Sequence, residues 1–549
     1  MQRVRGSSTM LHRAPRPPAA GSARPFALAL LAVVVAALLR AALLPDPGAS
    51  AAPVVDEAPV VDDVARLVPA PQRVTRPATP PWNGAIEARI ARWKDEARRI
   101  SAAVDSVDQI TVGVCVDDLA SGEELCAIGA DTPLRPASNM KLVTTAAALV
   151  LLGPQFEFVT RFEAGGAVER GVLAGDLIVR AGGDPLVRRG PAEPIEGPLD
   201  AVARRLVADG LRRVRGDLVL DEGAFADPSP APGWPDEKQR WAAYCALSGG
   251  FTVNGGVLEA SVDPGAAGAK ASVQVSPAAH GLKRRYDVDT VTKGPLEVLV
   301  GATRTTVTVR GRLPRDVGRY EAEFSFPDPV ELFGSVLRSE LERAGIQIDG
   351  SVLRRRHVPA GTPLATLHSP LVGVLEPINA RSRNGVADQV LLTLGQAVTG
   401  EGTRSGGERA ARGALRRLGV DAGGLVQVDG SGLSRENRAS PRQIVSLLEA
   451  VLRGEDDTAR LYRRSLAVAG ERGTLADRMR DTPARGRVSA KTGWITGTSA
   501  LSGVLETVGG RSLAFSILVS YPRQAGGLNT RCFKPMQDEI VTALVEGSP

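Results

Sequence analysis

The sequence predicts an α/β protein in which one domain is split by a long β-rich insertion. Short Val-rich segments separated by Gly and Pro turns fill residues 163–360, whereas segments of helical period lie on both sides of that stretch. Because helices return after the insertion, the simplest account is a single α/β domain that is interrupted in sequence. The chain has 549 residues, beyond the size at which one hydrophobic core stops growing, so more than one domain is expected.

Residues 1–44 predict a signal peptide or a signal anchor. Residues 1–40 hold arginines and no acidic residue, and the apolar run 26–39 is followed by small residues. The run is short for a membrane span but suits the core of a secretory signal. The Ala-Ser-Ala run at 49–51 is a candidate cleavage site, and the alternative is an uncleaved anchor that continues to Leu44. Both interpretations export the body of the protein to the periplasm or another extracytoplasmic face.

The charge of the chain argues against a nucleic-acid partner. The 67 basic and 61 acidic residues give a net charge of +6, and the arginines of the leader account for the whole excess. The rest of the chain is neutral and shows no basic patch that could neutralise phosphates. Membrane contact is expected only through the N-terminal segment, if that segment is not cleaved.

The remaining elements follow in order. Residues 45–82 are rich in Pro and Ala and predict a flexible tether. The first part of the split domain, 83–162, contains a helix at 84–104, a hairpin and a helix from Ser138 to Leu152. The insertion carries one helix, at 328–345. The second part, 361–549, contains helices at 384–398, 406–418 and 440–452, strands near 500–506 and 512–520, and a terminal helix.

The four cysteines are Cys115, Cys126, Cys245 and Cys532. None forms a C-x-x-C pair, so the spacing gives no support for a zinc site, and neither a metal nor a cofactor is expected. Cys115 and Cys126 flank the turn of the predicted hairpin. Export would permit a cross-strand disulfide there, and two buried free thiols are the alternative. The pairing of the four stays open.

The first candidate motif is the S-x-x-K sequence Ser138-Asn139-Met140-Lys141. Positions i and i+3 share one face of a helix, so a lysine can approach the serine hydroxyl. The lysine amine can act as the base if burial lowers its pKa, and the helix N-terminus favours negative charge at the serine. The alternative without catalysis is a helix cap followed by a surface lysine. If this motif stood alone, that alternative would be favoured.

Two further motifs follow in the second part of the domain. Ser382-Arg383-Asn384 precedes a helix. Ser382 could supply a second hydroxyl that relays protons beside Lys141, and Asn384 an amide that fixes a substrate carbonyl, although both residues also suit helix capping. Lys491-Thr492-Gly493 lies in a strand-like segment of a chain in which lysine is scarce. On an edge strand it could bind a peptide backbone and a carboxylate, with Gly493 permitting close approach. The alternative is an ordinary lysine near a turn.

Taken together and in this order, S-x-x-K, S-x-N and K-T-G are the motif set of β-lactamases and penicillin-binding proteins. The gap from 138 to 382 is too long for a compact β-lactamase. The chain resembles the D-alanyl-D-alanine carboxypeptidase/endopeptidase family, the low-molecular-mass class C type-4 penicillin-binding proteins. Further matches are AGGDPLV, APGW, DGSGLSRENRASP, GTLADRM and SAKTGWITGTSALSGVL. The resemblance implies a transpeptidase-type domain with an antiparallel sheet flanked by helices, split by one or two small inserted domains.

The resemblance also implies a function and partners. It implies a serine-type D-Ala-D-Ala carboxypeptidase, D,D-endopeptidase or both, acting on peptidoglycan stem peptides that end in D-Ala-D-Ala. β-Lactam antibiotics would be inhibitors. In this scheme Ser138 is the nucleophile and Lys141 its base, and Ser382 relays the proton to the leaving amine.

The remaining motif residues are expected to hold the substrate. The resemblance assigns the acyl-side amide to Asn384 and the terminal carboxylate to Lys491 and Thr492, beside Gly493. The oxyanion would sit between the backbone N–H groups of Ser138 and Trp494. In the insertion, Asp221 and Phe225 resemble positions that contact a side-chain amine in relatives, and an ordinary surface acid is the alternative.

The chain departs from the family at Trp494, where Ser or Thr is common. The backbone N–H survives this change, but a carboxylate-binding hydroxyl is lost. Two alternatives therefore stay open. One is a β-lactamase-like hydrolase that uses the same three motifs, and the other is a catalytically weak peptidoglycan-binding or scaffold protein.

Overall fold

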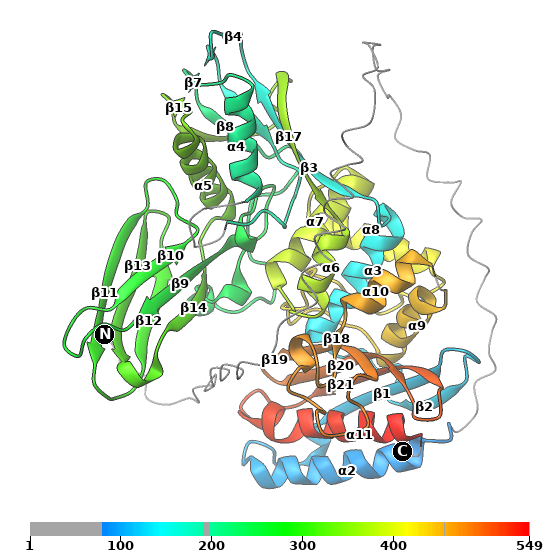
Figure 1. Ribbon diagram of the computed structural model, residues 1–549. Coiled ribbons are helices and arrows are strands. Elements are labelled where there is room, and N and C mark those ends of the chain that lie inside the picture. Colours follow the sequence, from blue (N-terminus) through cyan, green and yellow to red (C-terminus); the bar gives the residue numbers. More distant parts are fainter. Residues whose placement is uncertain (1–79, 190–196, 455, 548–549) are drawn as a thin grey trace, which may run out of the picture. The chain divides into compact units, whose positions relative to one another are not determined.

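The structure is a computed structural model that describes residues 80–189, 197–454 and 456–547 (Figure 1). The expected signal segment 1–44 and all but the end of the tether at 45–82 lie outside the described residues. None of the helices in these described ranges is long and apolar enough to span a membrane.

A six-stranded antiparallel sheet carries the candidate site. Its strands are, in order, β18 (Ala467–Val468), β19 (Val488–Ile495), β20 (Thr498–Glu506), β21 (Ser512–Ser520), β1 (Thr111–Asp118) and β2 (Glu124–Ile128). β1 pairs with β21 along its whole length, from Thr111 opposite Ser520 to Asp118 opposite Leu513. Strands that precede and follow the long insertion therefore share one sheet, which confirms the predicted α/β class with an antiparallel sheet.

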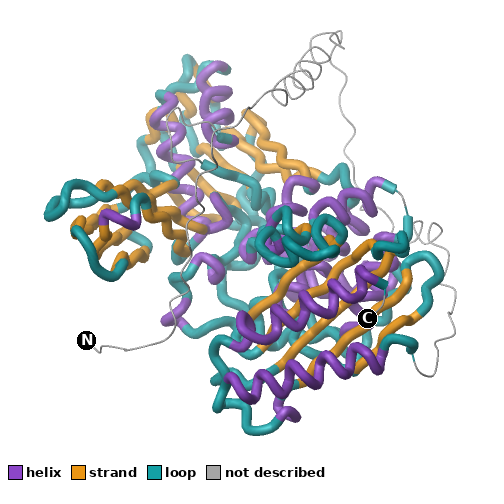
Figure 2. Tube along the Cα trace, turned by 60° about the horizontal axis from the view of Figure 1, so that its bottom comes forward, coloured by secondary structure: helices purple, strands orange, loops and turns teal. Residues whose placement is uncertain are grey.

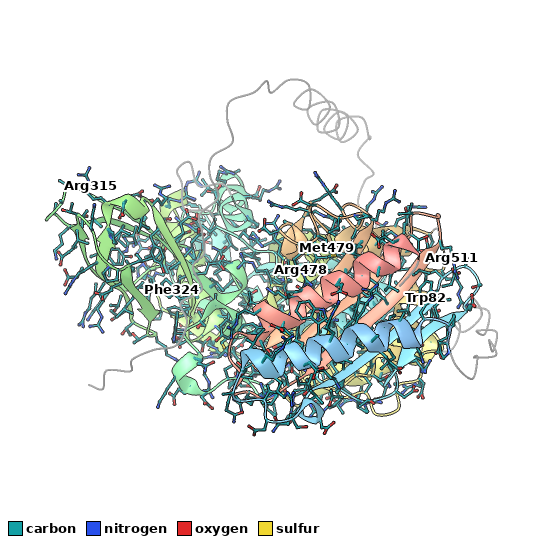
Figure 3. The ribbon with its side chains drawn as sticks, turned by 90° about the horizontal axis from the view of Figure 1, so that it is seen from below. Trp82, Arg315, Phe324, Arg478, Met479 and Arg511 are labelled. Carbon is teal, nitrogen blue, oxygen red and sulfur yellow. The ribbon has the colours of Figure 1, made fainter. Side chains whose placement is uncertain are left out.

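Helices cover both faces of this sheet. α2 (Asn83–Ile100) and α11 (Lys534–Glu546) run side by side on one face (Figures 2 and 3), where the indole N–H of Trp93 donates to Glu539. Six helices pack together in the core on the other side (Figure 1). They are α3 (Met140–Leu152), α6 (Val372–Asn379), α7 (Asn384–Thr399), α8 (Arg404–Arg417), α9 (Pro441–Leu452) and α10 (Asp457–Ser465).

The insertion leaves and re-enters this helical part through two paired strands. β3 (Glu157–Ala164) pairs antiparallel with β17 (Thr362–Pro370), with Glu157 opposite Pro370 and Ala164 opposite Thr362. The two ends of a stretch of about two hundred residues are thereby held together, and loop length adds little to the entropy of closing it. This pairing explains how the surrounding sheet and helices tolerate so long an interruption.

Within the described part of the insertion, the strands form four small sheets. One has the order β16 (Val352–Arg355), β8 (Leu218–Asp221), β6 (Leu177–Arg180), β3, β17, and a second the order β15 (Gln347–Ile348), β7 (Arg213–Val214), β5 (Val172–Leu173), β4 (Val168–Glu169). The other two are β10 (Ser272–Ser276), β9 (Val257–Asp263), β14 (Tyr320–Ser325) and β11 (Lys283–Val291), β13 (Thr306–Pro314), β12 (Glu297–Ala302). α4 (Pro198–Ala208) and α5 (Pro329–Ala344) pack on them.

The structure contains helices that the sequence pattern did not predict. α4 lies in the stretch expected to be β-rich, and α10 is short and strongly charged. α6 contains Pro377, a residue that ordinarily breaks a helix because it lacks an N–H and clashes with the preceding turn. Tertiary packing stabilises these helices, since apolar side chains of all three are buried.

All four cysteines are buried free thiols. Cys115 pairs with Ala127 and Cys126 pairs with Val116, so the two cysteines are one position out of register. Because side chains alternate between the faces of a strand, Cys115 enters the core of the helices and Cys126 the core under α2 and α11. Of the two alternatives for this hairpin, the structure has the free thiols.

Candidate active site

Ser138 lies in a single 3-10 turn, Ala137–Asn139, directly before α3. The preceding Ala137 has a φ of +46°, a left-handed conformation that costs energy for a residue with a side chain. Gly432 packs against this turn, and a Cβ there would collide with the Ala137 carbonyl oxygen. The strained turn leaves the Ser138 side chain half-buried at the start of the helix.

Lys141 is completely buried although it is one helical turn from Ser138. α3 is buried at every position from Met140 to Leu149, so it carries the lysine into the core. The Nζ atom donates to Ser138 Oγ at 3.0 Å, to Asn384 Oδ1 at 2.7 Å and to the Ser431 carbonyl oxygen at 2.6 Å. Burial lowers the pKa of Lys141 to about 7 despite the opposing charges of Asp429 and Asp388. At neutral pH a large fraction of this amine is therefore uncharged and able to accept a proton.

Lys491 is the second buried lysine of the site. Its Nζ donates to Ser382 Oγ at 2.9 Å and to the Thr492 carbonyl oxygen at 2.8 Å. Burial, and then the charge of Lys141, lower the pKa of Lys491 well below its ordinary value. The structure thus brings the S-x-N serine to the K-T-G lysine, whereas the sequence analysis expected that serine beside Lys141.

Asn384 connects the catalytic part of the chain to the insertion. Its Oδ1 accepts from Lys141, and its Nδ2 donates to the Tyr244 carbonyl oxygen at 2.9 Å. Ser382, two residues earlier, has a φ of +61°. Ser382 is therefore, with Ala137, a second residue of the site that has a left-handed, strained backbone conformation.

β19 brings the K-T-G residues against the nucleophile turn. A Cβ on Gly493 would lie 2.9 Å from the Pro136 carbonyl oxygen and 3.1 Å from the Ser138 backbone nitrogen, so only glycine permits this approach. β18 pairs only with Ser489 and Ala490, which leaves the 491–495 half of β19 as a free edge among the described strands. The Trp494 side chain is exposed beside this edge.

Thr474 is a site residue that the motif analysis missed. Its hydroxyl accepts from Thr492 Oγ1 at 2.9 Å, so two hydroxyls lie together beside the K-T-G lysine. Thr474 comes from the GTLADRM segment, which carried part of the family resemblance but was given no role. The resemblance in this segment was the available signal in the sequence, and the fold places Thr474 beside Thr492.

Asp221 and Phe225 do not lie among these groups. Asp221 is buried at the end of β8, where it accepts from Arg180 at 2.6 Å and from the backbone of His357 and Val358. Phe225 is also buried, and its backbone forms a bridge with Gly402. Because Asp221 is buried and already accepts hydrogen bonds inside the insertion, the structure gives no support to contact with a substrate amine, which stays a prediction.

Comparison with known proteins adds the family. The model of the D-Ala-D-Ala carboxypeptidase 3 (S13) family matches residues 97–536. The chain belongs to this family. A D-alanyl-D-alanine carboxypeptidase from Actinomadura sp. (strain R39) is 36% identical over 461 residues, which are 80% of this chain and 83% of that protein. The D-alanyl-D-alanine carboxypeptidase DacB of Haemophilus influenzae is 27% identical, over 74% of this chain and 84% of that protein.

A solved structure shows the same fold. The crystal structure of penicillin binding protein 4 (dacB) from Haemophilus influenzae superimposes with a TM-score of 0.69 and 24% identity. The superposition covers 82% of this chain and 99% of the chain in the crystal structure. The S13 assignment and this shared fold confirm the resemblance drawn from the three motifs.

In this S13 family member, a buried carboxylate supports the Lys141 side of the site. Asp429, on the DGSGLS segment, is completely buried. It accepts hydrogen bonds from the backbone N–H groups of Ser431, Gly432 and Ser434, and from the side chains of Asn437 and Trp234. The Ser431 carbonyl in turn accepts from Lys141, so Asp429 fixes the loop that positions the lysine.

Replacing Asp429 with alanine is expected to destabilise the fold by at least about 3 kcal/mol, because several buried donors lose their acceptor. Urea unfolding followed by fluorescence measures this change. The variant Asp429→Asn keeps the shape and one acceptor oxygen, and it removes the charge that raises the pKa of Lys141. Its activity profile should shift to lower pH. An alanine variant as stable as wild type would contradict this role of Asp429.

Proposed function

We propose that the chain is a serine-type D-Ala-D-Ala carboxypeptidase, with or without D,D-endopeptidase activity, that acts on peptidoglycan stem peptides through an acyl-enzyme at Ser138. The observation that carries the proposal is the 3.0 Å contact between Ser138 Oγ and the buried Lys141 amine, whose pKa is about 7. Membership of the S13 family and the names of its relatives support the same activity.

In the acylation step, neutral Lys141 takes the proton of the Ser138 hydroxyl as its oxygen attacks the carbonyl carbon of the penultimate D-alanine. The peptide C–N bond breaks, and the proton that Lys141 accepted passes through Ser382 to the leaving amine, which returns Lys141 to its neutral form. A Ser138 ester remains, and water hydrolyses it to release the shortened peptide and the free serine. A base with a pKa near the working pH is the most effective in such a step.

The other motif residues would hold the substrate on both sides of this carbonyl. Asn384 is next to Lys141 and would bind the acyl-side amide, while Lys491 and Thr492 would bind the terminal carboxylate. We assign the oxyanion hole to the backbone N–H groups of Ser138 and Trp494. The contact of Gly493 with the Ser138 backbone supports this, since it brings β19 beside the nucleophile.

The decisive experiment is acylation of the purified protein by labelled penicillin, followed by peptide mapping and by digestion of muropeptides. One label per chain on Ser138, slow release of that label and release of D-alanine are expected. Rapid release of hydrolysed penicillin would instead indicate a β-lactamase. A protein that binds muropeptides but takes no label would be a peptidoglycan-binding protein. The basic, apolar N-terminal segment supports export, so activity is expected outside the cytoplasm.

Trp494 is expected to limit cleavage of substrates that end in a free carboxylate. Trp494→Thr restores a hydroxyl at this position and should raise kcat/KM for D-alanine release about tenfold, the effect of one added hydrogen bond to a charged group. Trp494→Phe adds no hydroxyl and serves as the control. Initial rates on a pentapeptide ending in D-Ala-D-Ala measure the change. An equal effect of both variants would show that ring size, not the lost hydroxyl, matters.

A further inference from the structure

A cleft of about 620 Å³ opens beside the S-x-N loop, on the side of the insertion. It is lined by Ser382, Arg383 and Asn384, and also by Glu259 and Glu323 from the sheet of β9 and β14. The volume is that of a site for a ligand much larger than one alanine residue. Ser382 and Asn384 have roles in the proposed acylation, whereas the other lining residues of the cleft have none.

Most charged groups of the cleft are already paired. Arg383 binds Glu323 through both terminal nitrogens, one at 2.7 Å, and Arg381 binds Glu376 at 3.0 Å. Glu259 lies directly opposite Glu323 on the neighbouring strand. Burial, and then the charges of Glu321 and Glu323, raise the pKa of Glu259, and the guanidinium of Arg383 offsets only part of this. Arg383 is therefore already paired with Glu323.

Arg188 is different. It is exposed, it lines the same cleft, and no carboxylate among the described residues forms an ion pair with it. Arg381 and Arg383 line the same cleft, and after partial desolvation of the guanidinium their charges further lower the pKa of Arg188. A bound carboxylate would relieve this repulsion and could accept two parallel hydrogen bonds from the guanidinium.

The position of Ser382 indicates which side of the cleaved peptide bond the cleft faces. Under the proposed function Ser382 passes the proton to the leaving amine, so the leaving group must lie over this hydroxyl. Ser382 is also part of the cleft wall. A single D-alanine would end at Lys491 and Thr492, but a longer leaving group would continue into the cleft.

We propose that this cleft is a subsite for the peptide on the leaving side of a cross-linked substrate, and that Arg188 binds a carboxylate of that peptide. The inference rests on the proposed function and extends it to D,D-endopeptidase activity. Arg188 acts only on binding and takes no part in acylation. Loss of the arginine should therefore separate two activities that share one nucleophile.

The test compares Arg188→Ala, Arg188→Lys and the control Arg161→Ala, which removes an exposed arginine from β3. Each protein is assayed with a purified cross-linked muropeptide dimer, with a monomeric pentapeptide and with labelled penicillin. For Arg188→Ala, kcat/KM on the dimer should fall about tenfold or more, the effect of losing a hydrogen-bonded charge. Rates with the pentapeptide and penicillin should stay within about twofold, and Arg188→Lys should recover part of the loss.

Three results would overturn the subsite. They are unchanged dimer cleavage by Arg188→Ala, an equal loss on all three substrates, and a wild-type protein that releases D-alanine but leaves the dimer intact. Failure of the proposed function looks different, because wild type would then take no penicillin label or release it rapidly, and would not release D-alanine from the pentapeptide. Arg161→Ala should match wild type in every assay.

Discussion

Replacing Ser138 with alanine is expected to abolish both labelling by penicillin and release of D-alanine, with kcat falling about 10⁶-fold, as for other serine peptidases that lose the nucleophile. The Lys141 amine donates to the Ser138 Oγ atom, and among the described residues no other hydroxyl lies within hydrogen-bond distance of that amine. The variant retains the site for binding, so it should still bind muropeptides without cleaving them.

The measurements are mass spectrometry of the penicillin adduct and chromatography of digested muropeptides. Ser121→Ala, in the exposed turn between β1 and β2, is the matched control and should behave as wild type. The side chain of Ser138 is only half-buried, so its loss should leave the unfolding midpoint nearly unchanged. An alanine variant that still takes the label would contradict the assignment of the nucleophile.

Replacing Lys141 with methionine is expected to lower the acylation rate by about 10³-fold, within the range that general bases contribute. The pKa of this lysine is about 7 because burial disfavours the charged amine. Acylation by wild type should therefore rise with pH through about 7, as the amine loses its proton. The methionine variant should lose that rise. Stopped-flow acylation between about pH 5.5 and 9 measures both effects.

The same pKa predicts a change in stability with pH. The folded amine loses its proton near pH 7, whereas the unfolded amine holds it until about 10.5, so the unfolded state binds more protons between these values. The free energy of unfolding of wild type, relative to Lys141→Met, should therefore rise as the pH increases above about 7. A flat difference across this range would show that Lys141 is not neutral in the folded protein.

Local patterns were enough to place the motifs on their elements. The helix from Ser138 to Leu152 differs from the observed one mainly in its first turn, which is 3-10 up to Asn139, before α3 begins at Met140. Lys491-Thr492-Gly493 lies on a strand, as the sequence pattern predicted, and among the described strands this half of β19 has a free edge. Such features follow from side-chain period and from residues close in sequence, which one sequence carries directly.

Other features depend on contacts between distant residues, and no local pattern contains them. Ser382 meets Lys491 across 109 residues, and Asn384 meets Lys141 across 243. Trp234, from the insertion, donates to Asp429 at 2.5 Å, so the inserted part supports the loop behind the lysine. These side-chain contacts form because separate helices and strands pack together. The cost of closing the long loops between them depends on loop length and leaves no local sequence pattern.

The sequence by itself determined that the chain has a serine and a lysine one helical turn apart, a partner set of S-x-N and K-T-G, and a long β-rich interruption between them. Only the tertiary structure decided that Lys141 is buried with a pKa of about 7 and that the Lys491 amine donates to the Ser382 hydroxyl. It also decided that Cys115 and Cys126 lie on opposite faces of the sheet. The physical reason is that spacing fixes which side chains share a local face, whereas burial and strand register depend on everything packed around them.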